Sequence, residues 1–224
     1  MTRHQFIVVP FICFCLALTP AAAAETITPA PVKEDVALAA LSPLDKGDIA
    51  RIESYFDAVT TMTARFYQVT SQGGVAEGRI YLSRPGKMRV EYNPPTPLQI
   101  IADGENLIYY DSELNSANAI GLSETPAGVM LRRKLNLGSD VKISGFSRGR
   151  GVLKLTLVDG ANPDAGTLAL TFSDKPLILR KWAVTDPQGI VTTVALLDAR
   201  FGMELDPALF VFEDPKKLYV PFEN

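Results

Sequence analysis

The sequence has only one histidine and two cysteines, and all three lie within its first 15 residues. The rest of the chain cannot form a Ser-His-Asp or Cys-His catalytic site, because both need a histidine. An ordinary zinc site, which uses histidine and cysteine ligands, is excluded for the same reason, as is a disulfide framework. No G-x-G-x-x-G or G-x-x-x-x-G-K-[ST] motif follows a predicted strand. Most routes to an enzyme are therefore closed.

An excess of charge of one sign is also lacking. The chain has 22 Lys and Arg against 25 Asp and Glu, a net charge of −3. Loss of the first 24 residues, argued below, removes Arg3 and leaves −4. This mildly acidic balance lacks the excess of positive charge that is typical of proteins that bind nucleic acid or an anionic membrane surface. We expect no nucleic-acid partner.

The N-terminus reads as a secretory signal peptide. One basic residue, Arg3, precedes the apolar run from Phe6 to Leu18, and Ala22-x-Ala24 fits a small-residue cleavage site. The apolar run is only about thirteen residues long, whereas a spanning helix needs roughly 20. We therefore predict that residues 1–24 are cleaved off, with an uncleaved anchor as the alternative.

Cys13 and Cys15 lie inside the apolar run without the small-residue pattern of a lipid attachment site, so we expect no lipid on the mature protein. Residues 25–42 are rich in proline and alanine and predict a flexible leader. Residues 43–224 are long enough for one domain with a single core.

A first helix is predicted to begin at Ser42-Pro43, because serine is a favoured N-cap and proline a favoured first helical residue. Ile49, Ile52 and Phe56 then recur at helical spacing and form one apolar face. The helix should end near residue 58, before a run of β-branched residues.

Short runs of alternating apolar and polar residues follow, separated by turn residues, and predict about ten strands. They cover residues 64–70, 75–83, 87–92, 98–103, 106–111, 139–148, 152–158, 166–173, 178–186 and 190–200, with a final piece near 209–213. Residues 125–137 predict a second short helix. Two helices cannot cover one face of so large a sheet, which must curl. We expect a mainly β fold: one curved antiparallel sheet that forms an incomplete β-barrel, capped by a lid of short helices, around a packed core or a cavity.

Several motifs in order resemble one family. They are F-x-Q at Phe66, E-G-x-I-x-L-x-R-P-G-K-M-R-x-E-Y from Glu77, P-x-x-I-I-A-D-G-x-x-L-x-Y-Y-D from Pro97 and D-P-x-L-F-x-F-x-D-P from Asp206. Together they resemble the LolA-like periplasmic carriers of outer-membrane lipoproteins. The resemblance spans roughly residues 44 to 215.

The resemblance implies an incomplete barrel with a hydrophobic cavity, and a monomeric periplasmic chaperone without a cofactor. It implies acylated lipoproteins as cargo, which an inner-membrane ABC-type exporter supplies and an outer-membrane acceptor receives. In this family the arginine of the strand-ending Arg-Pro pair holds the lid closed through hydrogen bonds to lid backbone, and that position is Arg84 here. The Pro-rich leader and the Gly-Lys-Met-Arg after Arg84-Pro85 depart from better-known members.

The strand periodicity and the resemblance together select cavity and lid candidates. Methionine suits such a cavity, because its flexible side chain adapts to different ligands. The candidates for the acyl-chain cavity are Phe66, Ile80, Leu82, Met88, Val90, Ile100 and Leu107. The candidates for the lid are Ile52, Phe56, Met130 and Leu131.

Three other functions remain open at this point. The protein could carry another envelope lipid or glycolipid, because an apolar cavity specifies little beyond a greasy ligand. It could be a lipoprotein-sensing module on the same fold. A carboxylate-based glycosidase is a third alternative, although acidic residues such as Asp103 and Asp111 fall in turns rather than in a paired arrangement.

Overall fold

The computed structural model describes residues 41–138, 141–160 and 163–213. The predicted signal peptide, including Cys13 and Cys15, and the predicted leader as far as residue 40 lie outside the described residues. The described part contains eleven strands, two α-helices and three short 3₁₀-helices. None of its helices is long and apolar enough to cross a membrane.

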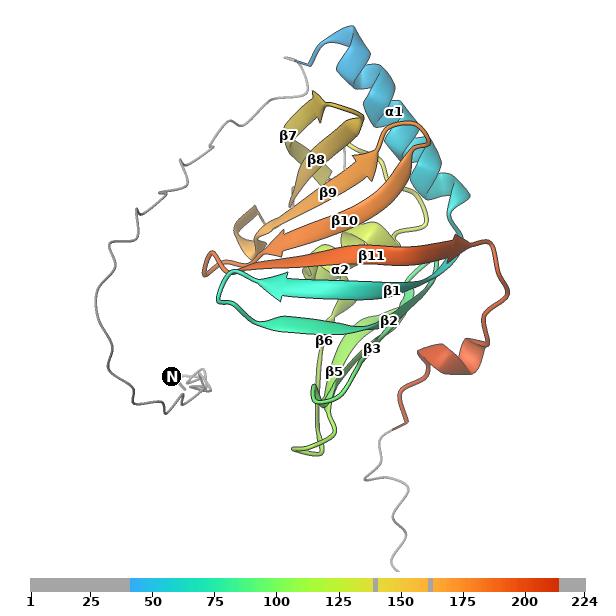
Figure 1. The fold of residues 1–224 in the computed structure, drawn as a ribbon, viewed down its shortest axis with the longest axis vertical. Coiled ribbons are helices and arrows are strands. Elements are labelled where there is room, and N and C mark those ends of the chain that lie inside the picture. The colour runs from blue at the N-terminus through green and yellow to red at the C-terminus, as the bar shows by residue number, and fades with distance from the viewer. Residues whose placement is uncertain (1–40, 139–140, 161–162, 214–224) are drawn as a thin grey trace, which may run out of the picture. The chain divides into compact units, whose positions relative to one another are not determined.

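The strands form one antiparallel sheet (Figure 1). Their order across it is β6-β5-β4-β3-β2-β1-β11-β10-β9-β8-β7, so the pairing of β1 with β11 joins the two halves. The strands are β1 (Thr61–Thr70), β2 (Val75–Ser83), β3 (Lys87–Tyr92), β4 (Leu98–Asp103), β5 (Asn106–Asp111), β6 (Ser116–Gly121), β7 (Val141–Gly149), β8 (Val152–Asp159), β9 (Thr167–Ser173), β10 (Ile178–Thr185) and β11 (Val191–Phe201). Within the described residues the edge strands β6 and β7 do not pair, which confirms the incomplete barrel.

Helix α1 (Pro43–Ala58) forms where local signals predicted it. The Ser42 side chain accepts a hydrogen bond from the Asp45 backbone N–H, and the Asp45 carboxylate accepts one from the Ser42 N–H, each at 3.2 Å. This reciprocal pair satisfies two N–H groups that the first helical turn leaves without partners. Ile49, Ile52 and Phe56 are buried and form the predicted apolar face.

Helix α2 (Pro126–Leu131) is shorter than the predicted helix over residues 125–137. Thr125 caps its start by accepting a hydrogen bond from the Gly128 N–H at 3.2 Å. The chain leaves the helix at Arg132, which is extended. The prediction was wrong at this end because good helix formers follow Arg132, while tertiary contacts described below hold its carbonyl outside the helix.

The structure differs from the prediction at two further places. Strand β6 was not predicted, because its sequence SANAIG has no apolar alternation. It forms because Asp111 accepts hydrogen bonds from the N–H groups of Glu113 and Leu114 and turns β5 back on itself. The expected final strand near 209–213 does not form: residues 209 and 210 belong to the 3₁₀-helix η4 (Pro207–Phe210), which Asp206 caps, and residues 211–213 are in no strand.

The main core lies between one face of the sheet and the two helices. We call this face the inner face. On β8 and β9 it carries a run of almost fully buried apolar side chains, which are Leu153, Leu155, Leu157, Leu168, Leu170 and Phe172. A separate small contact lies on the outer face, where Arg89 on β3 donates a hydrogen bond to the carbonyl of Leu209 in η4 at 3.1 Å. The C-terminal segment therefore covers part of the outer face and leaves the inner face to the helices.

Candidate functional site

The inner face encloses a cavity of about 320 Å³ beneath α2. Seven of the predicted residues line it, namely Phe66, Ile80, Met88, Val90, Ile100 and Leu107 from the sheet and Met130 from α2. No described residue in the lining is an Asp, Glu, Lys, Arg or His. The cavity is therefore a largely apolar container without charged groups for acid–base chemistry.

Strand register explains why residues from different strands meet in this cavity. Ile80 on β2 lies opposite Val90 on β3, Val90 lies opposite Ile100 on β4, and Ile100 lies opposite Tyr109 on β5. Residues directly opposite one another in a sheet point to the same face. One transverse row of side chains thus crosses four strands, and the next row on the inner face contains Met88.

The remaining predicted residues lie next to the cavity rather than in its lining. Leu82 and Phe56 border a small adjoining void of about 20 Å³ between the sheet and the helices, together with Arg84. Ile52 and Leu131 are fully buried in the core, with exposures of 0% and 1%. These residues belong to the core that packs the helices against the sheet beside the cavity.

Arg84 lies between the two helices, two residues beyond Leu82 at the end of β2. Its Nη1 donates hydrogen bonds to the backbone carbonyls of Phe56 and of Val59, the latter at 3.2 Å. Its Nε donates to the carbonyl of Arg132 at 3.1 Å, and its Nη2 donates to the same oxygen. A single guanidinium therefore binds the end of α1 and the end of α2 together.

The surroundings of Arg84 strengthen this contact. The guanidinium carbon lies 5.5 Å from the centre of the Phe56 ring, within cation–π range. Burial lowers the pKa of the Arg84 guanidinium, while the nearby Asp57 carboxylate raises it. An arginine keeps its charge despite such a shift, because its ordinary pKa lies far above neutral pH. The carbonyls thus receive charge-assisted hydrogen bonds.

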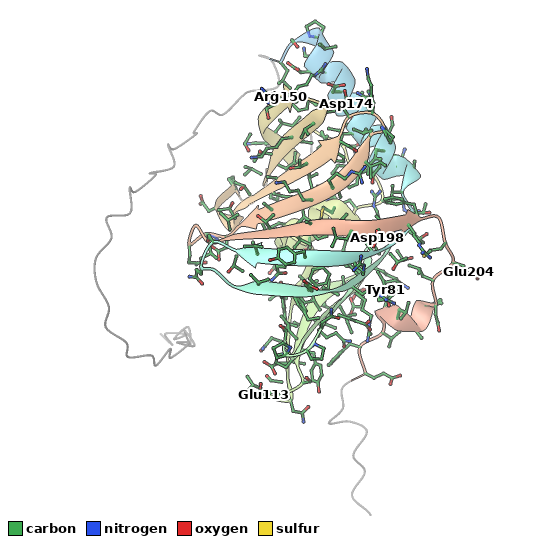
Figure 2. The ribbon with its side chains drawn as sticks, viewed as in Figure 1. Tyr81, Glu113, Arg150, Asp174, Asp198 and Glu204 are labelled. Atoms are coloured by element: carbon green, nitrogen blue, oxygen red, sulfur yellow. The ribbon has the colours of Figure 1, made fainter. Side chains whose placement is uncertain are left out.

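The other end of α1 is attached to the sheet through a buried carboxylate. Asp48, which is 5% exposed, pairs with Arg51 on the same helix at 2.8 Å and with Arg148 on β7. Arg51 also pairs at 2.8 Å with Asp174, which follows β9 and lies beside α1 (Figure 2). Helix α1 is therefore held near its start by ion pairs and near its end by Arg84.

Polar groups in the cavity lining were not predicted as site residues. They are Gln68, Tyr92, Tyr109 and Thr192. The Tyr92 hydroxyl donates a hydrogen bond to Oε1 of Gln68 at 2.9 Å. Burial raises the pKa of Tyr92 to about 12. Burial also raises the pKa of Tyr109.

A signal for some of these residues was present in the sequence. Gln68 is two residues beyond Phe66, and Tyr109 is two beyond Leu107, so period-two alternation places both on the inner face. Trp182, Val184, Thr192 and Val194 also line the cavity from β10 and β11. Only the pairing of β1 with β11 brings them there.

A larger groove of about 580 Å³ lies over β7 to β11 on the outer face. Its lining includes Arg148, Lys154 and Lys181. Lys154 lies between Leu153 and Leu155 on β8, both of which point into the core, so it faces outward. An acyl chain in this groove would lie against charged groups, and the apolar inner cavity is the better candidate site.

Comparisons with known proteins identify relatives of this chain. The model of the family described as "Outer membrane lipoprotein carrier protein LolA" matches residues 57–213. The outer-membrane lipoprotein carrier protein of Chromobacterium violaceum is 26% identical over 188 residues, which cover 81% of this chain and 90% of the relative. The outer-membrane lipoprotein carrier protein of Methylobacillus flagellatus is 30% identical over 183 residues, which cover 75% of this chain and 85% of the relative. A crystal structure of a LolA superfamily protein from Nitrosomonas europaea covers 73% of this chain and 97% of its own, with a TM-score of 0.45 and 10% identity.

Proposed function

This chain belongs to the LolA family of outer membrane lipoprotein carrier proteins. From this premise we propose that it is a non-enzymatic periplasmic chaperone that shields the acyl chains of lipoproteins. It receives them from an inner-membrane ABC-type exporter and delivers them to an acceptor at the outer membrane. The observation that carries the proposal is the uncharged cavity beneath α2, whose described lining is apolar except at one end.

The energetics of burial favour an acyl ligand. Removal of a chain of about 16 carbons from water contributes roughly 12 kcal/mol, at about 0.8 kcal/mol per CH₂. A carrier must offset most of this cost of exposure and still release its cargo. Met88 and Met130 lie on opposite walls of the cavity, one on β3 and one on α2, where flexible thioether side chains adapt to chains of different shape.

The size of the cavity requires the helices to move. Pockets for small molecules span roughly 300–1,000 Å³, so about 320 Å³ is near the lower limit. A lipoprotein with several acyl chains needs more room than this. We therefore infer that the structure corresponds to the closed conformation, and that α1 and α2 form a lid that separates from the sheet when cargo enters.

Arg84 is the proposed latch of this lid. Its hydrogen bonds to Phe56, Val59 and Arg132 join the two helix ends, so lid opening must break at least some of them. These bonds stabilise the closed state, in which no cargo is bound. They therefore lower the net affinity for cargo, so that the carrier can release it to an acceptor. This device balances tight shielding against transfer.

The test is to purify the mature protein from periplasm under mild conditions and to identify bound molecules by native mass spectrometry. A bound triacylated lipoprotein, enriched in the Arg84→Leu variant, is the expected result. A free phospholipid or glycolipid in its place would move the function to transport of another envelope lipid. A protein without any lipid in both forms would contradict the carrier function.

A further inference from the structure

The polar groups of the cavity gather towards one end of it. Along the inner face of β2, moving away from Arg84, the residues are Leu82, Ile80, Gly78 and Ala76. Gln68 on β1 lies opposite Ala76, and Tyr92 on β3 lies opposite Gly78. The cavity thus has an apolar end beside the Arg84 latch and a polar end remote from it.

Two more hydroxyl groups belong to this polar end. Thr192 on β11 lies opposite Thr70, one inner-face row beyond Gln68. Tyr109 is one row nearer the latch than Tyr92, and both side chains line the same cavity. We call Gln68, Tyr92, Tyr109 and Thr192 the polar pole.

The hydrogen bond between Tyr92 and Gln68 decides what the polar pole offers to a ligand. The Tyr92 hydroxyl donates a hydrogen bond to Oε1 of Gln68, which fixes the orientation of the amide. Both N–H bonds of Gln68 Nε2 then remain as donors. Among the described residues, no hydrogen-bond partner exists for Gln68 Nε2 or for the hydroxyls of Tyr109 and Thr192. Three donor groups, with four N–H or O–H bonds between them, therefore line the apolar cavity without an acceptor among the described residues.

We propose that the polar pole binds the ester and amide carbonyl groups that join the acyl chains of the cargo to its glyceryl-cysteine end. This inference rests on the proposed carrier function and adds the orientation of the lipid. Carbonyl oxygens only accept hydrogen bonds, and the unpartnered groups of the pole can all donate them. The hydrocarbon tails then extend towards Met88 and Met130, and the polypeptide leaves at the polar end.

The chemistry of the pole also selects among lipids. A free fatty acid carries a carboxylate at this place, and a carboxylate that is partly removed from water is costly without a cation beside it. No described residue of the cavity lining is a lysine or an arginine. The pole therefore favours neutral, esterified or amidated acyl chains over free fatty acids.

The experiment compares two synthetic probes by competition against a fluorescent acyl probe. One is a triacylated cysteinyl lipopeptide, and the other is the same lipopeptide with its two ester carbonyls replaced by CH₂, which gives neutral ethers and keeps the N-acyl amide. The wild-type protein should bind this diether probe about 10-fold more weakly, the effect of one or two lost hydrogen bonds. Palmitate should compete more weakly than a neutral palmitate ester.

The variant Gln68→Leu should narrow the difference between the two lipopeptides to about 3-fold, because it lacks the amide donors but keeps the hydroxyls of Tyr109 and Thr192. The matched control is Gln99→Leu. Gln99 lies on β4 between Leu98 and Ile100, both of which line the cavity, so its side chain points to the outer face. This control should keep the wild-type preference.

Equal affinity of the wild-type protein for the two lipopeptides would overturn the carbonyl-binding pole and leave the carrier function intact. This comparison needs no variant, so a folding defect in Gln68→Leu cannot hide the answer. An undiminished 10-fold preference in a folded Gln68→Leu protein would overturn the role of Gln68. Failure to bind either lipopeptide would instead contradict the proposed function itself.

Discussion

Arg84 and Arg132 are joined by a hydrogen bond from the Nε of one to the backbone carbonyl of the other, at 3.1 Å. The two residues are 48 positions apart, and the bond connects the end of β2 to the point where α2 stops. Because the same guanidinium also donates a hydrogen bond to the carbonyl of Phe56 on α1, one side chain contacts the ends of both helices.

Replacement of Arg84 by leucine should increase retention of cargo. Hydrogen bonds from a charged donor contribute about 1.5–3 kcal/mol each, so loss of those present only in the closed state should raise the apparent cargo affinity about 10-fold or more. Transfer of a radiolabelled lipoprotein from the loaded carrier to outer membranes should slow accordingly. Arg79→Leu, on the exposed outer face of the same strand, is the control. Normal transfer by Arg84→Leu would contradict the latch.

An acidic residue in the cavity should weaken binding of acyl chains. Met88→Asp places a carboxylate in the apolar lining, where its desolvation opposes lipid entry, and we expect affinity for a fluorescent acyl probe to fall at least about 10-fold. Met88→Leu should bind almost normally, since it conserves volume and polarity. Arg79→Asp, with the acidic residue on the outer face, should also bind normally. Unchanged binding by a folded Met88→Asp protein would remove Met88 from the binding surface.

Removal of the Asp48 carboxylate should destabilise the protein. Asp48→Ala leaves Arg51 and Arg148 without their shared partner and detaches the start of α1 from β7. Both arginines are partly exposed, so water offsets part of the loss, and we expect about 2 kcal/mol in the free energy of unfolding. Urea unfolding followed by circular dichroism measures this difference. Asp57→Ala, at an exposed position of the same helix, should change stability by less than about 0.5 kcal/mol.

Stability should fall at alkaline pH because of Tyr92. Its pKa rises from the ordinary value of 10.0 to about 12 in the folded protein, so the unfolded chain loses this proton first as pH increases. The stabilisation is fully present below pH 10 and is lost as pH rises through the folded pKa, by up to about 2–3 kcal/mol. Urea unfolding of the wild type and of Tyr92→Phe at pH 9 and pH 11.5 should show about 1–2 kcal/mol more alkaline loss in the wild type. Parallel pH profiles for the two proteins would contradict this.

Local sequence signals predicted helix α1 correctly, since Ser42, Pro43 and the apolar spacing act within a few residues of one another. They also located most strands, because period-two alternation reflects which face is buried. Strand β6 was not predicted because residues 117–120 are exposed on both faces of the strand, so burial imposes no apolar alternation on them. The end of α2 was predicted too late because Arg84 holds the carbonyl of Arg132 outside the helix, and no local sequence pattern indicates this contact.

The sequence by itself determined the class of the fold, the inner faces of β1 to β5 and seven of the sixteen residues that line the cavity. The tertiary structure decided which strands complete that cavity, since Trp182 and Thr192 reach it only through the pairing of β1 with β11. It also decided that Tyr92 orients the amide of Gln68. The physical reason is that alternation and capping are local properties of the chain, whereas a cavity and its hydrogen bonds arise where distant segments meet.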